Sequence, residues 1–219
     1  MKYPNFSEEK KLCKKGFKRV VGLDEAGRGP LAGPVLAGAV MVNSKFRIKN
    51  SKLKVNDSKK LSEKKRRELY KILVNHSQIE WGIGRVSEKV IDRINILEAT
   101  KLAMKRAIKN LGKKLKKKQQ KKSDSVGFLI LDGRIKLDLD IPQKSIIKAD
   151  NKVFSCAAAS IIAKVSRDRI MQRWDKKYVR YGFLKHKGYA TKLHLKMLKK
   201  YKPCKIHRKS FKPVQRLLH

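Results

Sequence analysis

Acidic residues are scarce in this chain, and four of them lie next to apolar segments that have the character of β-strands. The 219 residues include 58 Lys and Arg but only 18 Asp and Glu. Asp24 and Glu25 directly follow the segment RVVGL. Asp132 directly follows GFLIL, and Asp150 comes two residues after SIIK. Because α/β proteins place their chemistry where strands end at the edge of a sheet, we expect these carboxylates to meet at one such edge.

Carboxylates that are brought together repel one another, and a bound cation is a common way to keep them ionised. Oxygen ligands favour Mg²⁺ or Mn²⁺, and the sequence offers no Cys and His set with zinc-ligand spacing. Two such ions about 3.5–4 Å apart stabilise both the attacking and the leaving oxygen of a phosphodiester. The four acids therefore predict a Mg²⁺ or Mn²⁺ site that hydrolyses phosphodiesters. Strand-end acids that only form turns or cap helices are the alternative.

The segment AGRGP at residues 26–30 determines whether Asp24 and Glu25 can act together. Adjacent residues of a regular strand face opposite sides of the sheet, so both reach one site only if the chain leaves strand geometry. Gly27 and Gly29 flank Arg28 and would let backbone amides approach a nucleic-acid backbone closely. A simple tight turn is the alternative, and the segment lacks the spacing of a Walker A loop.

The charge of the chain points to a polyanionic partner. The formal net charge is +40, and a field of that size attracts nucleic acid and speeds its capture. Residues 176–219 contain fifteen Lys or Arg and no Asp or Glu. A codon bias toward lysine is an alternative origin of the excess, but it would leave the electrostatic consequence unchanged.

Apolar periodicity and turn residues predict an α/β protein with a mixed sheet. The expected strands cover residues 18–24, 33–42, 79–86, 127–131 and 145–148. The expected helices cover residues 62–75, 87–112, 153–178 and 191–200.

We divide the chain into a basic N-terminal tail (1–17), a catalytic domain (18–175) and a basic helical extension that binds substrate (176–219). Within the domain, residues 113–125 are rich in lysine and predict a solvated, flexible linker.

Several classes of protein are disfavoured. The longest apolar run, 33–42, is much shorter than the roughly 20 residues of a membrane span. The first residues show no apolar segment of a secretory signal. The three cysteines are odd in number and form no C-x-x-C pair, which argues against a disulfide framework. We expect a cytoplasmic monomer with no membrane partner.

Motifs along nearly the whole chain resemble those of bacterial ribonuclease HII. They are GLDEAGRGPLAGPV (22–35), DSKKLSEKKRRELY (57–70), IDRINILEATKLAMKRA (91–107), LILDG (129–133), AAASIIAKVSRDR (157–169), YGFLKHKGYATKLHL (181–195) and IHRKSF (206–211). The resemblance implies a ribonuclease-H-like mixed sheet flanked by helices, with a C-terminal helical extension. It also implies cleavage of the RNA strand of RNA–DNA hybrids, and incision 5′ of single ribonucleotides in duplex DNA that leaves a 3′-hydroxyl and a 5′-phosphate.

The resemblance assigns roles to individual residues. The metal ligands and catalytic acids are Asp24, Glu25, Asp132 and Asp150. The turn formed by Gly27, Arg28 and Gly29 senses the 2′-hydroxyl, which distinguishes RNA from DNA, largely through backbone contacts. Tyr189 stacks on the sugar beside the RNA–DNA junction, and Lys59 is expected to contact a phosphate. A solvated lysine is the alternative for Lys59.

Two positions depart from the family pattern. Ala149 and Ala190 stand where glycine is usual. Both are tolerable unless the backbone there needs a positive φ.

Further residues carry weaker expectations. His186, His194 and His207 favour packing or phosphate contact over metal ligation, because their spacings form no ligand set. Lys164 and Arg167 either face substrate or are exposed.

Two other functions compete with this one. A non-enzymatic basic nucleic-acid-binding protein would explain the charge but has no use for four strand-end acids. An enzyme of the ribonuclease HIII class would cleave hybrids but incise little at a single ribonucleotide.

Overall fold

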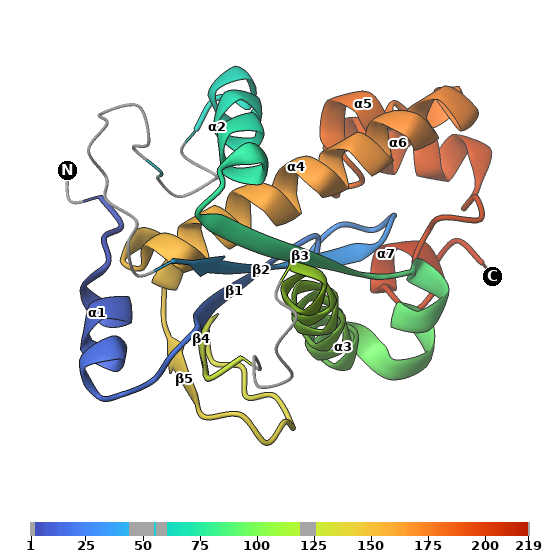
Figure 1. Ribbon diagram of the computed structural model, residues 1–219. Helices are drawn as coiled ribbons and strands as arrows, with labels where there is room; N and C mark the ends of the chain where they lie inside the picture. Colours follow the sequence, from blue (N-terminus) through green and yellow to red (C-terminus); the bar gives the residue numbers. More distant parts are fainter. Residues whose placement is uncertain (1–2, 44–54, 56–60, 119–125, 219) are drawn as a thin grey trace.

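The computed structural model of the chain describes residues 3–43, 55, 61–118 and 126–218. Its centre is a mixed five-stranded sheet with the strand order β3-β2-β1-β4-β5 (Figure 1). The strands are β1 (Val20–Ala26), β2 (Val35–Val42), β3 (Ile79–Val86), β4 (Phe128–Asp132) and β5 (Gln143–Ile146). β2 pairs antiparallel with both β1 and β3, whereas β4 pairs parallel with β1 and β5 pairs parallel with β4. The α/β class with a mixed sheet is thereby confirmed.

Helices cover both faces of the sheet. α3 (Glu88–Lys118) packs against β3, β2 and β1 on one face, and α4 (Phe154–Lys177) packs against β1 and β2 on the other (Figure 1). α2 (Glu63–Asn75) lies against α4 and begins at Ser62, whose hydroxyl accepts a hydrogen bond from the Lys65 amide at 3.2 Å. The helices expected over 62–75 and 153–178 are confirmed to within one or two residues.

Small residues let α4 approach the sheet closely. The first half of this helix is buried on nearly all sides, as its apolar sequence SCAAASIIAKV indicates. A Cβ atom on Gly38 of β2 would lie 2.5 Å from the Ala159 carbonyl oxygen, so a larger residue would push the helix away. This close packing brings Ser160 of α4 next to the acidic residues of β1.

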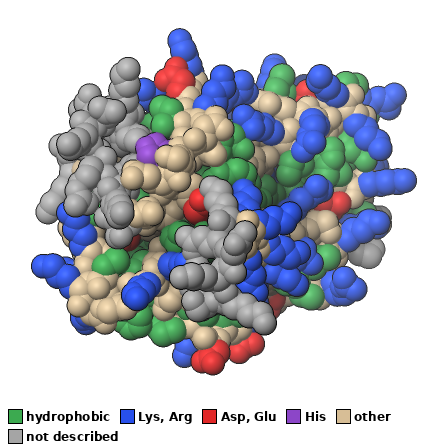
Figure 2. All heavy atoms as spheres, viewed as in Figure 1, with side chains coloured by type: hydrophobic (Ala, Val, Ile, Leu, Met, Phe, Trp, Pro, Cys, Tyr) green, Lys and Arg blue, Asp and Glu red, His purple; other side chains and the backbone are tan. Residues whose placement is uncertain are grey.

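The C-terminal extension consists of short helices with a core of their own. They are η3 (Val179–Tyr181), α5 (Phe183–His186), α6 (Lys192–Tyr201) and α7 (Lys212–Gln215). Phe183, Leu198 and Val214 pack there with Met171 of α4 and Leu31 of the loop after β1. The extension is therefore joined to the rest of the fold by shared apolar packing. Lys and Arg side chains gather around it at the right of Figure 2.

The lysine-rich linker expected at 113–125 is wrong in its first part. α3 continues to Lys118, and Leu115 is buried in the main core together with Leu111 one turn earlier. The expected helix ends at Gly112, but glycine is tolerated inside a helix, and α3 runs through it. Residues 119–125 lie outside the described residues.

Other elements differ from the sequence-based expectations in smaller ways. Helix α1 (Ser7–Lys14) forms within the segment expected to be a tail, and its Leu12 is buried. Asn95, with a φ of 64°, interrupts α3, and its Oδ1 accepts from the Leu97 amide at 2.9 Å as a helix cap does. No helix of the described residues is both long and apolar enough to cross a membrane.

Candidate active site

Asp24 and Asp132 lie side by side on two parallel strands, Asp132 as the last residue of β4 and Asp24 two residues before the end of β1, which continues past its expected end at residue 24. Leu23 of β1 pairs with Leu131 of β4, so the next residue of each strand reaches the same level of the sheet. Gly38, the partner of Asp24 on β2, faces α4, and Asp24 points to that same face, where Ser160 hydrogen-bonds its carboxylate. The two acids therefore meet between the sheet edge and α4, as their strand-end positions predict.

Asp150 joins them from the short helix η2 (Ala149–Asn151), which leads into α4. One carboxylate oxygen from each of Asp24, Asp132 and Asp150 lies within 4.8 Å of the others. The Ala149 amide donates to Asp132 Oδ1 at 2.5 Å and so fixes the helix against the strand end. The residue with positive φ is Lys148 at 56°, not Ala149, so alanine in place of the usual glycine is unstrained.

Burial and the repulsion between neighbouring carboxylates make this cluster suited to bind a cation. Asp24 is only 5% exposed, and its pKa is raised well above the ordinary value. The first cause is burial, followed by repulsion from Glu25 and Asp132, while hydrogen bonds from Ser160 and the Glu25 amide act in the opposite direction. Three oxygen donors in a partly dehydrated place suit a hard divalent cation such as Mg²⁺ or Mn²⁺.

Glu25 is not part of the three-aspartate cluster. β1 stays a strand through Ala26, so the Cβ atoms of Asp24 and Glu25 leave the backbone on opposite sides, and only the length of the Glu25 side chain brings its charge near the cluster. Its Oε1 lies 3.5 Å from Nη1 of Arg28. It is nevertheless close enough for its charge to raise the pKa of Asp24. The structure thus brings together three of the four predicted acids and leaves Glu25 at the margin.

The turn of Gly27, Arg28 and Gly29 follows the acids directly. Gly27 has a φ of 98°, and a Cβ there would collide with the side chain of Arg167. Glycine is therefore required at this position for both its conformation and its packing. Arg28 and Gly29 are exposed.

Tyr189 stands beside this turn, in the loop between α5 and α6. Its side chain is 42% exposed, and a Cβ on Gly29 would lie 3.9 Å from its Cε1. Lys164 Nζ and Arg167 Cζ of α4 lie 5.8 and 5.9 Å from the ring centroid. The structure thus places Tyr189 beside the glycine turn. Lys59 lies outside the described residues.

Arg167 is neither exposed nor directed toward substrate, which corrects both expectations for it. The side chain is completely buried, and it donates at 3.0 Å to the carbonyl oxygens of Pro34, Lys187 and Ala32. It therefore ties the loop after β1 to the loop that carries Tyr189. Arg208 is equally buried and was not singled out by the sequence.

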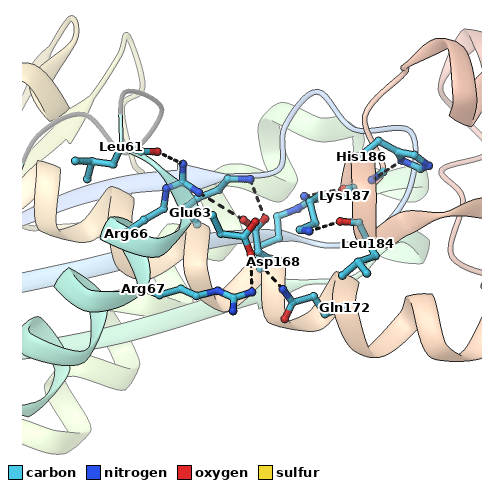
Figure 3. A network of polar contacts seen from close by, with 12 residues as sticks. Leu61, Glu63, Arg66, Arg67, Asp168, Gln172, Leu184, His186 and Lys187 are labelled. Atoms are coloured by element: carbon cyan, nitrogen blue, oxygen red, sulfur yellow. Dashed lines mark hydrogen bonds and ion pairs between the residues drawn. The ribbon is translucent and has the colours of Figure 1, made fainter.

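A network of polar contacts joins α2 to α4 near this region (Figure 3). Asp168 of α4 is buried. It accepts a hydrogen bond from Lys164 at 2.8 Å and lies 3.9 Å from Arg66. Arg66 in turn donates to the Leu61 carbonyl at 2.8 Å, so the network holds the start of α2 in place.

The three C-terminal histidines pack against one another. His186 stacks on His194 at a centroid distance of 4.3 Å, and Nε2 of His194 lies 3.0 Å from Nε2 of His207. Phe183 contacts all three rings. Packing, one of the two expected roles, is confirmed.

Comparison with known proteins agrees with this geometry. Residues 21–214 match the family model of ribonuclease HII. The chain is 49% identical to the ribonuclease HII of Acetivibrio thermocellus over 203 residues, which are 93% of this chain and 73% of that protein. The curated relative thus covers the strands, the acids and most of the extension.

Solved structures share the fold. The ribonuclease H2 of Pyrococcus horikoshii OT3 superposes with a TM-score of 0.74 at 24% identity, covering 91% of this chain and 97% of that one. The structure of Bst-RNase HIII in complex with Mn²⁺ gives a TM-score of 0.65 at 17% identity, covering 91% and 69%. Together with the family match, the strand-end acids and the adjoining glycine turn, these comparisons establish that the chain belongs to the ribonuclease HII family.

Proposed function

We propose that the chain cleaves the RNA strand of RNA–DNA hybrids and also incises duplex DNA on the 5′ side of a single embedded ribonucleotide. Family membership makes it a ribonuclease H endonuclease that uses divalent metal ions. The finer proposal rests on one observation. The cluster of Asp24, Asp132 and Asp150 lies beside an exposed glycine turn and an exposed tyrosine.

The residues of the cluster fit a divalent cation, because the buried Asp24 carboxylate is destabilised by neighbouring negative charges. Asp24, Asp132 and Asp150 would hold Mg²⁺ or Mn²⁺, with Glu25 as the fourth catalytic acid. When bound, such ions activate a water for attack and stabilise the negative charge of the leaving oxygen. The products would be a 3′-hydroxyl and a 5′-phosphate.

The rest of the site binds and orients the nucleic acid. The turn of Gly27, Arg28 and Gly29 would meet the 2′-hydroxyl, whose donor and acceptor properties distinguish RNA from DNA. Tyr189 would stack on the sugar next to the RNA–DNA junction, which its exposure and its place beside Gly29 support. Lys59 would contact a phosphate, and the basic extension 176–219 would hold the duplex by its charge.

The proposal is tested with a labelled DNA duplex that contains one ribonucleotide. We expect a single nick 5′ of the ribonucleotide with Mg²⁺ or Mn²⁺, no product with chelator, and no cleavage of the all-DNA duplex. Cleavage of an RNA–DNA hybrid without this nick would assign hybrid-only specificity. Binding without cleavage of either substrate would indicate a non-enzymatic nucleic-acid-binding protein. The cytoplasmic location and the monomeric state stay predictions.

A further inference from the structure

Arg208 of the C-terminal extension reaches back to the glycine turn beside the acids. Its side chain is fully buried, although it belongs to the basic segment 176–219. Nη2 donates to the Gly27 carbonyl at 2.5 Å, Nη1 to the Arg28 carbonyl at 2.8 Å, and Nε to the Gly33 carbonyl at 2.9 Å. One guanidinium therefore binds two successive carbonyl oxygens of the turn and a third, that of Gly33, in the loop that follows the turn.

These bonds determine where the amides of the turn point. In a trans peptide the N–H and the C=O of one unit lie on opposite sides, and the described chain contains no cis peptide. With the Gly27 and Arg28 carbonyls directed at Arg208, the Arg28 and Gly29 amides are directed away from it. Neither amide donates a hydrogen bond to any of the described residues, and both residues are exposed. The turn thus presents two adjacent amide donors on its outer side.

Arg208 is itself held from several directions. Its own amide donates to the Leu31 carbonyl at 2.8 Å, and its guanidinium lies 5.0 Å from the centre of the Phe211 ring. The carboxylate of Asp92 on α3 accepts from the next two amides, Lys209 at 3.0 Å and Ser210 at 2.9 Å. The arginine therefore has little freedom to leave the turn.

The burial of Arg208 is costly, because no carboxylate forms an ion pair with its side chain among the described residues. Burial lowers its pKa to about 9, and the charge of Arg167 acts in the same direction. A buried cation of this kind depends on its hydrogen bonds. Lysine cannot replace it, because only the planar guanidinium offers donors in a fixed fork to separate acceptors.

We propose that Arg208 is a positioning residue for ribonucleotide recognition, acting through the carbonyls of Gly27 and Arg28 to aim the Arg28 and Gly29 amides at the 2′-hydroxyl of the substrate. The inference rests on the proposed function and adds to it a residue of the C-terminal extension, about 180 positions away from the turn in sequence. It makes the extension part of substrate selection as well as of general nucleic-acid binding.

The test compares Arg208→Lys with the wild-type protein on two duplexes of one sequence, with and without a single ribonucleotide. Affinity is measured with Ca²⁺ in place of Mg²⁺ to hold back cleavage, and kcat and KM are measured with Mg²⁺. We expect kcat at the ribonucleotide to fall by at least about tenfold, since at least one hydrogen bond to the transition state is lost. The preference for the ribonucleotide duplex should fall with it, while affinity for the all-DNA duplex stays within about twofold.

Val214→Ala is the matched control for loss of stability in the extension. Val214 is fully buried in the same C-terminal core but touches neither the turn nor the acids, so its variant should keep the wild-type preference. If Arg208 only stabilised the extension, Arg208→Lys and Val214→Ala would show the same preference for the ribonucleotide duplex. An unchanged ribonucleotide preference in Arg208→Lys would overturn the inference.

A second variant covers the case in which Arg208→Lys does not fold. Asp92→Ala leaves Arg208 in place but removes the acceptor of its neighbouring amides, and should reduce the same preference by a smaller factor. Full wild-type preference in Asp92→Ala would then count against the inference. Failure of the wild-type protein to nick the ribonucleotide duplex would contradict the proposed function itself. This outcome differs from failure of the Arg208 inference, in which the wild-type protein nicks the duplex and the variants keep its preference.

Discussion

His194 and His207 face each other through their Nε2 atoms, which lie 3.0 Å apart. Such a contact needs one donor and one acceptor, so the two rings cannot both carry a proton there. His194 Nδ1 lies 2.9 Å from the Tyr189 carbonyl oxygen, and His207 Nδ1 accepts from the Cys204 amide at 3.0 Å. The network therefore assigns one proton to Nδ1 of His194 and one to Nε2 of His207. It links this neutral pair to the backbone of Tyr189.

The pair predicts a loss of stability in mild acid. Burial lowers the pKa of His194 and of His207 from 6.5 to about 4. Between pH 6.5 and 4 the unfolded chain therefore binds more protons than the folded one, so the stability present above pH 6.5 is lost as the pH falls. Thermal unfolding followed between pH 7 and pH 4.5 should show the midpoint decreasing by several degrees.

His207→Gln separates this effect from general charge repulsion at low pH. The variant removes one of the two buried titrating rings, so its midpoint should depend less steeply on pH over the same window. The quantity compared is the slope of the unfolding midpoint against pH, not the stability at pH 7. Equal slopes in the variant and the wild type would show that the histidine pair is not the source.

Asp24→Asn should raise the stability of the protein and lower its activity. In metal-free buffer the substitution removes one of three carboxylates, two of them buried, that have oxygens within 4.8 Å of one another, so repulsion falls and the unfolding midpoint should rise by about 2–4 °C. With Mg²⁺ the same variant should lose at least about 100-fold in kcat. Asp138→Asn, at a fully exposed position, is the control and should change neither quantity. An Asp24→Asn variant with near-wild-type turnover would remove Asp24 from the site.

Tyr189 is predicted to act through its ring. Tyr189→Ala should reduce incision at a single ribonucleotide by about tenfold or more, by analogy with the stacking of an aromatic ring on a base, which contributes roughly 1–3 kcal/mol. Tyr189→Phe keeps the ring and should retain most of the activity. Binding to an all-DNA duplex is the comparison, and losses of equal size there would argue against a role at the junction.

Leu115 tests the unexpected length of α3. Its side chain is 4% exposed within the main core, so Leu115→Ala should lower the free energy of unfolding by about 2–3 kcal/mol. Leu97 lies on the same helix but is 42% exposed, and Leu97→Ala should change stability by less than about 0.5 kcal/mol. Denaturant titration of both variants measures the difference. Equal, small effects would indicate that the end of α3 does not pack.

The strand-end acids were predictable from sequence because their positions follow from simple periodicity. A buried strand followed by an acid indicates a carboxylate at the sheet edge, and Asp24 and Asp132 both meet that description. The same reasoning indicated that the side chains of Asp24 and Glu25 would leave a regular β1 on opposite sides, and β1 is regular there, so Glu25 acts on the cluster only through the length of its side chain. Asp150 could be predicted for a different reason, because it lies just before an apolar helix that had to pack at the centre of the fold.

The supporting residues were not predictable in the same way. Arg167 and Arg208 are two of 58 basic residues, and no local pattern marks a basic side chain as buried. All but one of their backbone carbonyl partners lie more than 130 positions away, so the signal exists only in the tertiary structure. Leu115 was misjudged because lysines surround it, although it follows Leu111 by one helical turn.

The most direct test of the whole account is a Mn²⁺ titration followed by the electron paramagnetic resonance signal of free Mn²⁺, run beside the nicking assay. Asp132→Asn is the variant to compare, because asparagine keeps an acceptor for the Ala149 amide and removes only the charge. If the three aspartates hold the catalytic metal, the wild-type protein binds Mn²⁺ and nicks the ribonucleotide duplex, and Asp132→Asn loses both together. Unchanged Mn²⁺ binding and unchanged nicking in Asp132→Asn would contradict it.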